Sequence, residues 1–524
     1  MYFALPRARG LATLVSASEH FRRLARVLLL FLCLVLPSAA QEPPPANGLS
    51  LAETVRLALD HDPNLRLEEA RLRAARGILL SSRGIFDPVV SSSLTETETD
   101  TPLSETASQS TAVLGNSFGV AKRFRTGLSV EPELALLRTD ETGAGAFNVG
   151  TLSFTVRQPL LRGRGRTATA AVERSAERQV AASELDVRQV TSERMLTVAS
   201  LYWEARAAVL NLGILRETED RSRELLETTR KLIEADVTPA AELVQVEADL
   251  AAKEAARIGG ERTLFAARHN LGREIGLDRP AIAVLPFPSD PFPVLPPTAA
   301  VAAETDRFVA AALERRADLQ AARERRDAAE ILRRAADNGL RPQLDLVLTP
   351  SYTGFVEGTD PGSFFSPLYR NVPGASAAFS LTLSWPTQNS AARGQLVQIE
   401  ASREQSTLVQ ELVEQSIEAD VPIALDAVNR HAEQLARATE AVRLFERAVV
   451  NEEKKLRAGT STLLDVISQR DRLTAARQSE VSAQLFLALA ILDLRFATGT
   501  ILSEPSDSID PALFTTVPLQ EVAP

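Results

Sequence analysis

Few residues of this chain have the type and spacing that catalysis or metal binding requires. The sequence contains one cysteine and four histidines. It has neither a CxxC nor an HExxH pattern, which excludes a thiol redox centre and a cysteine-rich zinc site. His61, His269 and His431 share no ligand spacing. Carboxylates are abundant, but the sequence places no pair of them for acid–base chemistry. We therefore predict a protein that is not an enzyme and has no cofactor and no metal site.

The charge balance argues against nucleic acid as a partner. The chain has 58 basic and 68 acidic residues and a formal net charge of −10. Nucleic-acid-binding proteins instead carry a basic patch or stripe. The segment 162–166 alternates arginine and glycine but lacks interleaved aromatic residues, so we interpret it as a junction between a strand and a helix.

The N-terminal segment up to Ala40 has the pattern of an export signal. Three arginines precede a short apolar run at 27–36, and small residues follow the run up to Ala40. The run is too short to cross a bilayer, which requires about twenty residues. We predict a signal peptide at 1–40 that is cleaved after Ala40. Because Cys33 lies inside it, the mature protein would contain no cysteine.

After the signal, the sequence repeats one order of elements, which indicates an internal duplication. Three blocks align in the same order in both halves: 55–88 with 309–342, Pro159 with Pro386, and Gly276 with Gly499. The stretch between the first two blocks is longer in the first half, which therefore contains an insertion. We place the repeats at 48–277 and 299–499. The insertion fits an extra β-hairpin at about 112–138, which only the first half contains.

Each half is predicted to contain short helices, two strands, a very long helix, a reverse turn and a return helix. In the first half, a helical segment from Ser50 to Gly84 is interrupted at Pro63. The remaining elements are strands 87–98 and 149–159 with helices 166–235 and 239–276, then helix 301–339, strands 342–354 and 374–386, and helices 392–457 and 462–498. The connector 278–298 is rich in proline and is expected to be non-helical, and a tail at 500–524 ends the chain.

The periodicities of these elements suggest their environments. The strands alternate apolar with small polar residues, which is typical of a strand between lipid and water. An ordinary sheet with one wet face would show the same alternation. The helix at 166–235 would be about 105 Å long and has coiled-coil spacing, so it must pack side by side with other rods. Pro422 is expected to kink the second long helix.

These features together resemble the TolC family of outer-membrane efflux proteins over nearly all of 49–500. The duplicated layout, the strand end Gln158-Pro159-Leu160 and the turn at 459–466 carry the resemblance. It implies a mainly α fold with a β-barrel portion, in which duplicated helix–β-hairpin–long helix–helix halves form a homotrimer. The trimer would be an outer-membrane β-barrel continued by a long periplasmic α-helical barrel. It would act as a passive export duct of a tripartite efflux or type I secretion system, with a periplasmic adaptor and an inner-membrane pump as partners.

Self-association also follows from the number of strands. Four paired strands and an optional hairpin are too few to enclose a water-filled lumen, and open edges are not tolerated in lipid. Three copies would give twelve strands, or eighteen if the extra hairpin joins the wall. The alternative from another class is a periplasmic coiled-coil scaffold or adaptor without a pore.

The resemblance also implies where the duct closes and where the adaptor docks. Asp465 matches an aspartate of the periplasmic constriction, and Glu242 matches its acidic partner on the other hairpin. Ser468 and Ser461 stand where the family has a second ring aspartate and, in some members, a gate-linking arginine. We therefore expect a single acidic ring and a weaker latch. Alternatively, Asp465 only complements the helix dipole. The adaptor-docking tips would be Asp236, Val237, Thr238 and Pro239, together with Gly459, Thr460, Ser461 and Thr462.

Overall fold

The computed structural model describes residues 48–105, 107–141, 145–236, 239–295, 305–370, 374–502 and 514–518. The predicted signal peptide, Val237, Thr238, and most of the C-terminal tail at 500–524 lie outside these ranges. All elements below belong to one unit, Leu49–Pro524.

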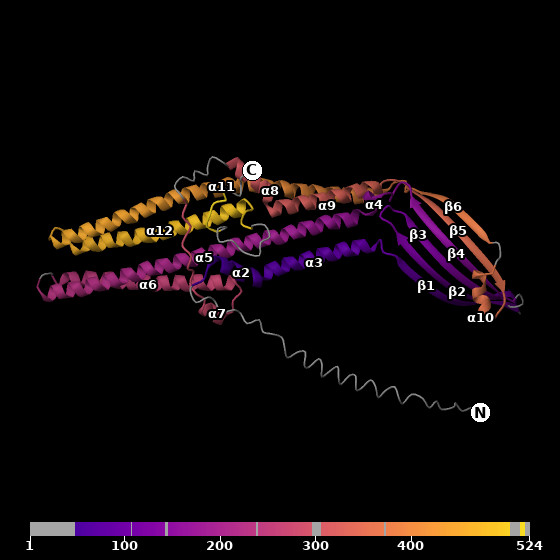
Figure 1. The fold of residues 1–524 in the computed structure, drawn as a ribbon, viewed down its shortest axis with the longest axis horizontal. Coiled ribbons are helices and arrows are strands. Elements are labelled where there is room, and N and C mark those ends of the chain that lie inside the picture. The colour runs from indigo at the N-terminus through magenta and orange to yellow at the C-terminus, as the bar shows by residue number, and fades with distance from the viewer. Residues whose placement is uncertain are drawn as a thin grey trace, which may run out of the picture. The chain divides into compact units, whose positions relative to one another are not determined.

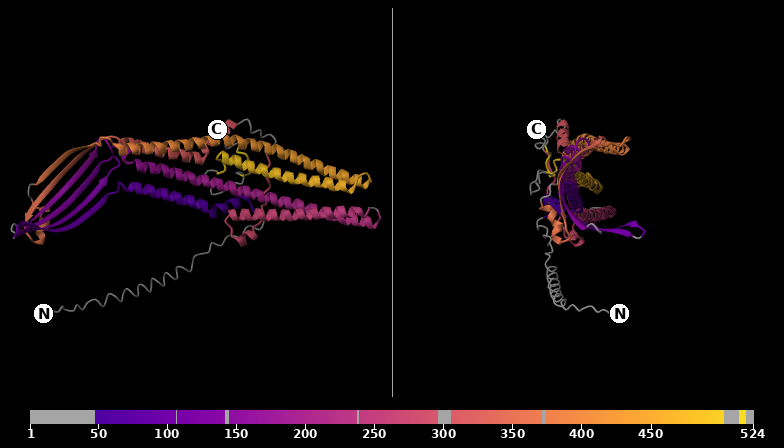
Figure 2. Two further views of the ribbon diagram at one scale, coloured as in Figure 1. Left: turned by 180° about the vertical axis from the view of Figure 1, so that it is seen from behind. Right: turned by 90° about the vertical axis from the view of Figure 1, so that its right-hand side faces the viewer.

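Six strands form one antiparallel sheet in chain order (Figure 1). They are β1 (Val89–Ser104), β2 (Ala107–Arg123), β3 (Ser129–Glu141), β4 (Gly145–Pro159), β5 (Gln343–Glu357) and β6 (Ala375–Ser384). The insertion of the first half forms β2 and β3, which lie between β1 and β4. The two strands expected at 87–98 and 149–159 are therefore not neighbours. The sheet is open and curved, and β1 and β6 are its free edges (Figure 2).

The strand register sorts the side chains of the sheet into two chemically different faces. One face is apolar over most of the sheet, although β1 carries Glu96 and Glu98 on it beyond Leu94. Its cross-strand pairs include Phe118 with Leu134, Leu134 with Leu152, Leu152 with Tyr352, and Leu348 with Phe379. The opposite face carries small polar residues, with hydroxyl contacts between Ser93 and Ser117 at 2.9 Å and between Ser351 and Ser376 at 2.8 Å. Many apolar side chains remain exposed, such as Leu94 at 73% and Phe379 at 70%.

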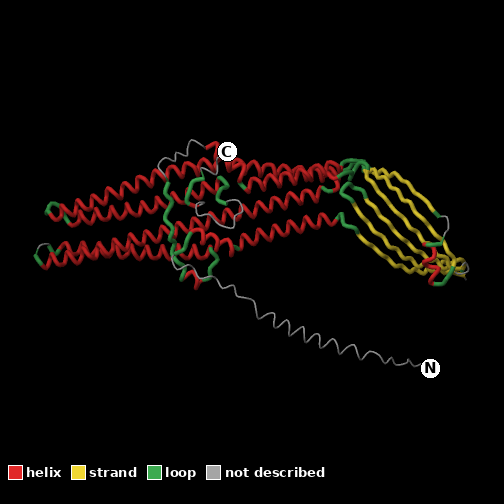
Figure 3. The backbone as a smooth tube through the Cα atoms, in the orientation of Figure 1, coloured by secondary structure: helices red, strands yellow, loops and turns green. Residues whose placement is uncertain are grey.

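The helices extend from one end of this sheet (Figure 3). The first half has α2 (Leu51–His61), α3 (Pro63–Gly84), α4 (Arg166–Thr169), α5 (Ala171–Glu234) and α6 (Ala241–Glu274). The second has α8 (Thr305–Arg315), α9 (Ala317–Gly339), α11 (Ser390–Arg457) and α12 (Leu463–Ala497). With 64 and 68 residues, α5 and α11 are about 96 and 102 Å long at 1.5 Å per residue. Among the described residues, no helix combines the length and the apolar character that a membrane span needs.

The single helix expected at 301–339 is instead two helices, α8 and α9, separated at Arg316. The backbone of Arg316 is extended, with φ −62° and ψ 124°, and Asp62 between α2 and α3 has φ −66° and ψ 120°. These two residues align in the duplication, so both halves break at the same place, although only the first has a proline there. Arg316 is buried, pairs with Asp318 at 2.6 Å and lies over the ring of Phe496. We infer that the local pair with Asp318 and the tertiary contact with Phe496 together hold the second break.

Three smaller features concern helix ends and prolines, and the first two differ from the predictions. The helix expected at 166–235 begins as a separate turn, α4, and Ala170 leaves helical geometry before α5. The connector expected to be non-helical contains α7 (Arg279–Ala283), because proline is tolerated in a first turn and the Asp278 side chain accepts a hydrogen bond from Ala281 N. Pro422, which is expected to kink the second long helix, lies inside α11, and the helix continues through it to Arg457.

Two apolar cores lie where the short helices meet the long ones. The first surrounds Trp203 of α5 and includes residues of α2, α6 and α12. The second is built around Phe308 of α8 with residues of α11 and α12. Tyr202 also ties the connector to the first core, because its hydroxyl donates to Leu49 O at 2.8 Å and accepts from Asp290 N at 3.1 Å.

Candidate functional site: the two helical hairpin tips

The tip between α11 and α12 is held by a glycine and a capping box. Gly459 has φ 72°, and its amide donates to Leu456 O at 2.9 Å, which ends α11. Thr462 begins α12: its hydroxyl accepts from Asp465 N at 3.3 Å, and its own amide donates to Asp465 Oδ2 at 3.1 Å. This reciprocal pair satisfies two backbone donors that the first turn would otherwise leave free. The geometry fixes Asp465 at the tip.

Asp465 is exposed, and its local contacts favour the charged form. Hydrogen bonds from the Thr462 hydroxyl and amide hold the pKa of this carboxyl below its usual value. The contact with the Thr462 hydroxyl is 2.6 Å long and uses Oδ2, as does the amide contact. Asp465 is thus a helix-capping carboxylate that stays ionised in mildly acidic solution. This contact does not conflict with a second role at a constriction.

A second carboxylate at this tip, Glu452 of α11, was not identified from the sequence. Ser461 donates to Glu452 Oε1 at 2.5 Å and lies 3.4 Å from Asp465 Oδ2. Lys455 pairs with Glu452 at 2.9 Å. The hydrogen bonds from Ser461 and Lys455 lower the pKa of Glu452. Ser461 therefore connects two carboxylates within its own hairpin. No spacing rule in the sequence would have indicated this contact, because it depends on how the turn folds.

The tip between α5 and α6 uses the same turn position with a different residue. Asp236 has φ 61°, and it aligns with Gly459 in the register of the third repeat block. Pro239 accepts a hydrogen bond from Glu242 N at 3.1 Å as α6 begins. Glu242 is half-buried in the first turn of α6, and Ser468 is half-buried one turn after Asp465. The first half thus places an aspartate in a left-handed conformation that favours glycine.

This difference predicts opposite effects of exchanging the two turn residues. Gly459→Ala should destabilise its tip by about 1 kcal/mol, because a Cβ is strained at positive φ, whereas Asp236→Gly should stabilise its tip by a few tenths to about 1 kcal/mol. Hydrogen exchange of the tip amides in the purified protein measures both changes. If the tip amides exchange equally fast in both variants and in the wild type, the turn conformation does not limit the stability of the tips.

An apolar contact joins the two hairpins near their tips. Leu226 of α5, Val246 of α6 and Ile467 of α12 form one buried cluster, with partly buried leucines around it. Glu242 and Asp465 therefore belong to hairpins that are packed together, as the sequence-based assignment requires. The cluster is small, so the polar contacts beside it contribute to holding the hairpins in register.

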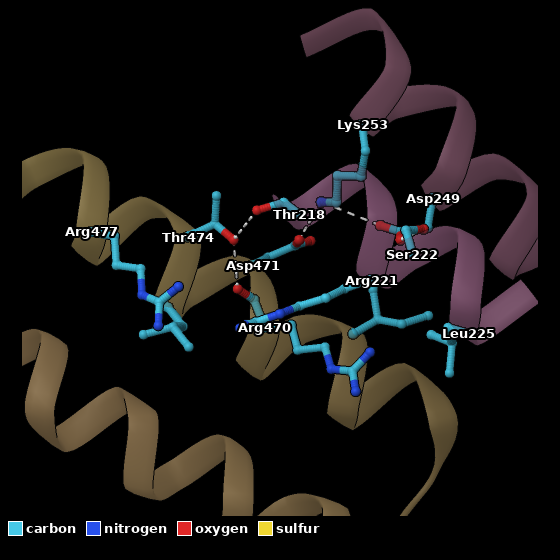
Figure 4. A pocket seen from close by; sticks show the side chains of 12 residues that line it. Thr218, Arg221, Ser222, Leu225, Asp249, Lys253, Arg470, Asp471, Thr474 and Arg477 are labelled. Carbon is cyan, nitrogen blue, oxygen red and sulfur yellow. Dashed lines mark hydrogen bonds and ion pairs between the residues drawn. The ribbon is translucent and has the colours of Figure 1, made fainter. Parts of the chain in front are cut away.

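Lys253 is at the centre of those polar contacts (Figure 4). Its ammonium group on α6 forms ion pairs with Asp249 of the same helix, at 3.3 Å, and with Asp471 of α12. Ser222 of α5 donates to Asp249 Oδ2 at 2.7 Å. Burial would lower the pKa of Lys253, but its hydrogen bond and charge interactions with Asp471 and Asp249 outweigh burial and raise the pKa. Lys253 thus remains charged and links α6 to α12, and Asp249 extends this network to Ser222 of α5.

A second cationic link lies next to it on α12. Arg477 contacts Glu217 of α5 at 3.1 Å and Glu446 of α11 at 2.9 Å, so one guanidinium bridges both hairpins. Thr474 of α12 and Thr218 of α5 approach within 3.3 Å. We call Lys253, Asp249, Asp471 and Arg477 the inter-hairpin cluster. The sequence did not reveal it, because its members come from helices of different halves, far apart along the chain.

Comparison with known proteins shows which proteins share this architecture. A family model described as outer membrane efflux protein matches residues 309–500. This match covers most of the predicted second repeat, 299–499. No curated protein matches the chain. The resemblance to the TolC family and the predicted fold class, mainly α with a β portion, are both confirmed.

Solved outer-membrane channels share the fold over most of the chain. The outer-membrane channel OprN matches with a TM-score of 0.59 at 18% identity, covering 89% of this chain and 96% of OprN. VceC from Vibrio cholerae matches with a TM-score of 0.61 at 18% identity, covering 86% of this chain and 96% of VceC. The CmeC outer membrane channel of Campylobacter jejuni matches with a TM-score of 0.61 at 14% identity, covering 87% of each chain.

Proposed function

We propose that this protein is an outer-membrane channel that acts as a passive duct for the export of small molecules or proteins. It would be the outer component of a tripartite efflux or type I secretion system. The observation that carries the proposal is the open six-stranded sheet, which has two free edges and one exposed apolar face. A pore-free periplasmic scaffold would have no use for such a face in water.

The free edges support closure by further copies of the same chain. Every residue of β1 and of β6 is exposed, and edge strands present unpaired backbone groups that lipid cannot satisfy. Strand direction alternates through six antiparallel strands, so β6 of one copy would run antiparallel to β1 of the next. The same contact repeated around an axis closes a ring. Since β2 and β3 belong to the sheet, three copies would give eighteen strands rather than twelve.

The helices beneath the two edges carry opposite charges. Contacts between helices order this layer as α3, α5, α9 and α11, so α3 and α11 lie at its edges. The exposed charged residues of α3 are five arginines and one glutamate: Arg66, Arg71, Arg73, Arg76, Arg83 and Glu69. Those at 390–426 of α11 are mostly acidic: Glu400, Glu404, Glu411, Glu418, Asp420 and Asp426, with Arg393 and Arg403. A ring of copies would bring the basic edge against the acidic edge, which favours a head-to-tail homotrimer.

Charge reversal at one edge should weaken this trimer. We expect Arg73→Glu to lower the fraction of trimer in detergent and to make that loss smaller at high salt, because salt screens the added repulsion. Light scattering after size-exclusion chromatography measures the mass. Arg174→Glu, an exposed position on α5, which lies inside this layer between α3 and α9, is the matched control. A wild-type protein that is a water-soluble monomer would contradict the whole proposal and favour the scaffold alternative.

The surfaces of the channel then divide by chemistry. The apolar face of the sheet would contact outer-membrane lipid, the small polar face would line the lumen, and the helices would extend into the periplasm. The predicted signal at 1–40 accounts for export to that location.

The tips at Asp236–Pro239 and Gly459–Thr462 would dock a periplasmic adaptor that connects to an inner-membrane pump. Bulky substitution at Ser461 or Thr238 should abolish adaptor cross-linking and leave the trimer intact; loss of the trimer would indicate a folding role instead.

Asp465 would form one acidic ring at the periplasmic aperture, with Glu242 near it. Three carboxylates around one axis repel each other and attract cations. We expect Asp465→Asn to weaken cation block of single-channel current in planar bilayers. Because the pKa of Asp465 is lowered, block of the wild type should persist as the pH falls through the usual titration range of aspartate. Unchanged block in the variant would remove Asp465 from the aperture. Ser468→Asp, which adds a second ring, should strengthen block.

A further inference from the structure

A short insertion between β5 and β6 folds back onto the sheet at the end away from the helices. It consists of α10 (Pro361–Phe365) and η2 (Ser366–Leu368) and contacts β3, β4 and β5. We call residues 358–370 the collar. In the ribbon the collar lies at the far ends of the strands (Figure 1).

Close packing identifies the face that the collar covers. Gly150 of β4 pairs with Leu136 of β3 and with Gly354 of β5, so all three lie on the apolar face. A Cβ on Gly150 would lie 2.9 Å from Pro367 Cβ, and one on Gly354 would lie 2.0 Å from Pro367 O. The two glycines are therefore required for the collar to approach. The collar covers the apolar face, not the lumen-facing one.

Beneath the collar this face carries the polar side chains of Arg138 and Asn148 beside the apolar Val356. Asn148 is fully buried and donates to Gly358 O at 2.9 Å. Arg138 donates from Nε to Asn148 Oδ1 at 2.9 Å and from a terminal nitrogen to Asp360 O at 2.9 Å. An arginine facing hydrocarbon is costly, by about 2–4 kcal/mol at the midplane of a barrel. The collar supplies acceptors that keep Arg138 and Asn148 out of that environment.

The height of the apolar band agrees with this boundary. Along β5, the band runs from Leu344 to Gly354, which is about 34 Å of strand. A strand tilted by about 40° rises about 26 Å over that length, and the lipid-facing band of outer-membrane barrels is about 25 Å tall. The collar therefore begins where a hydrocarbon layer would end.

Aromatic side chains mark both ends of the band. On the collar, Phe365 and Tyr369 are 55% and 73% exposed. At the helical end, Trp385 follows β6 in register with the apolar face and is 62% exposed. Tyrosine and tryptophan are enriched at the two membrane–water interfaces, where an amphipathic ring is half in lipid and half in water.

We propose that the collar is an interfacial anchor that lies among the lipid headgroups of the outer leaflet, with Phe365, Leu368 and Tyr369 toward lipid. This inference rests on the proposed function. A neighbouring subunit is not the occupant, because the collar contacts β3 to β5, whereas the seam between copies would lie at β1 and β6. The collar fixes how deep the sheet sits and shields Arg138 and Asn148 from hydrocarbon.

Spin labels on single cysteines test the proposal in the full protein in liposomes, in a Cys33→Ser background that has no other cysteine. Accessibility to oxygen, which partitions into lipid, is compared with accessibility to a nickel chelate, which stays in water. Leu368→Cys and Tyr369→Cys should give intermediate depth. Leu348→Cys on the apolar face should be deep in lipid, and Ser380→Cys on the polar face of β6 should be open to water.

The outcomes separate the anchor from the channel. If Leu348→Cys is in lipid but both collar labels are as open to nickel as Ser380→Cys, the collar projects into water and the anchor is refuted. Collar labels as deep as Leu348→Cys would refute it as well. If Leu348→Cys itself is open to water, the sheet is not in lipid and both proposals fail. Phe365→Asp should move the Leu368 label toward water, and an unchanged depth would also count against the anchor.

Discussion

Leu348→Arg is expected to block insertion into a bilayer, whereas the same replacement of its neighbour Thr349 leaves insertion intact. The two residues are adjacent on β5 and point to opposite faces. Leu348 pairs with Phe379 on the apolar face, and the hydroxyl of Thr349 lies 3.3 Å from that of Thr155 on the polar face. Both lie near the middle of the band from Leu344 to Gly354, where an outward arginine is most costly.

The expected cost is about 2–4 kcal/mol in each subunit, or about thirty-fold or more in the insertion equilibrium. Folding into liposomes, followed by the protease resistance of the sheet and by the mass of the oligomer, measures the difference. Thr349→Arg is the matched control, because it adds the same side chain at the same depth and directs it into the lumen. If the two variants insert equally well, the apolar face does not contact lipid.

Lys253→Met is expected to open the periplasmic end of the channel. Lys253 lies between Asp249 and Asp471, so its removal leaves two carboxylates facing each other across the contact between α6 and α12. Leaving such groups unpaired costs about 1–3 kcal/mol, and about 1.4 kcal/mol corresponds to a tenfold shift in a two-state equilibrium. The tips should separate and single-channel conductance should rise.

Two further variants show whether charge is the cause. Lys231→Met removes an exposed lysine near the end of α5 and should leave conductance unchanged. Adding Asp471→Asn to Lys253→Met removes the repulsion and should return conductance toward the wild-type level. A conductance that stays high in the double variant would indicate that Lys253 acts through packing. A conductance that never rises would exclude the inter-hairpin cluster as a latch.

Local sequence patterns were sufficient for the elements but not for all of their boundaries. The three-and-four spacing of apolar residues identified α5, and alternation identified the strands, because each periodicity reflects backbone geometry over a few residues. The break at Arg316 leaves no such periodic pattern, and only part of its support is local. It is stabilised by Asp318 and by Phe496, and the latter belongs to the distant C-terminal end of α12.

The candidate site divides in the same way. The turn at Gly459 and the cap formed by Thr462 and Asp465 could be read from the sequence, because a positive φ and a capping box are local. The pairing of Lys253 with Asp471 could not, since it joins residues separated by 218 positions.

The sequence by itself thus determined the duplication, the long rods, the two chemistries of the strands and the resemblance to a family of channels. The tertiary structure decided that β2 and β3 lie inside the sheet, that α3 and α11 form the edges of the helical layer next to it, and that the collar covers the apolar face. The physical reason is that strand order and helix packing depend on contacts between distant segments. Such contacts leave no periodic pattern along the chain.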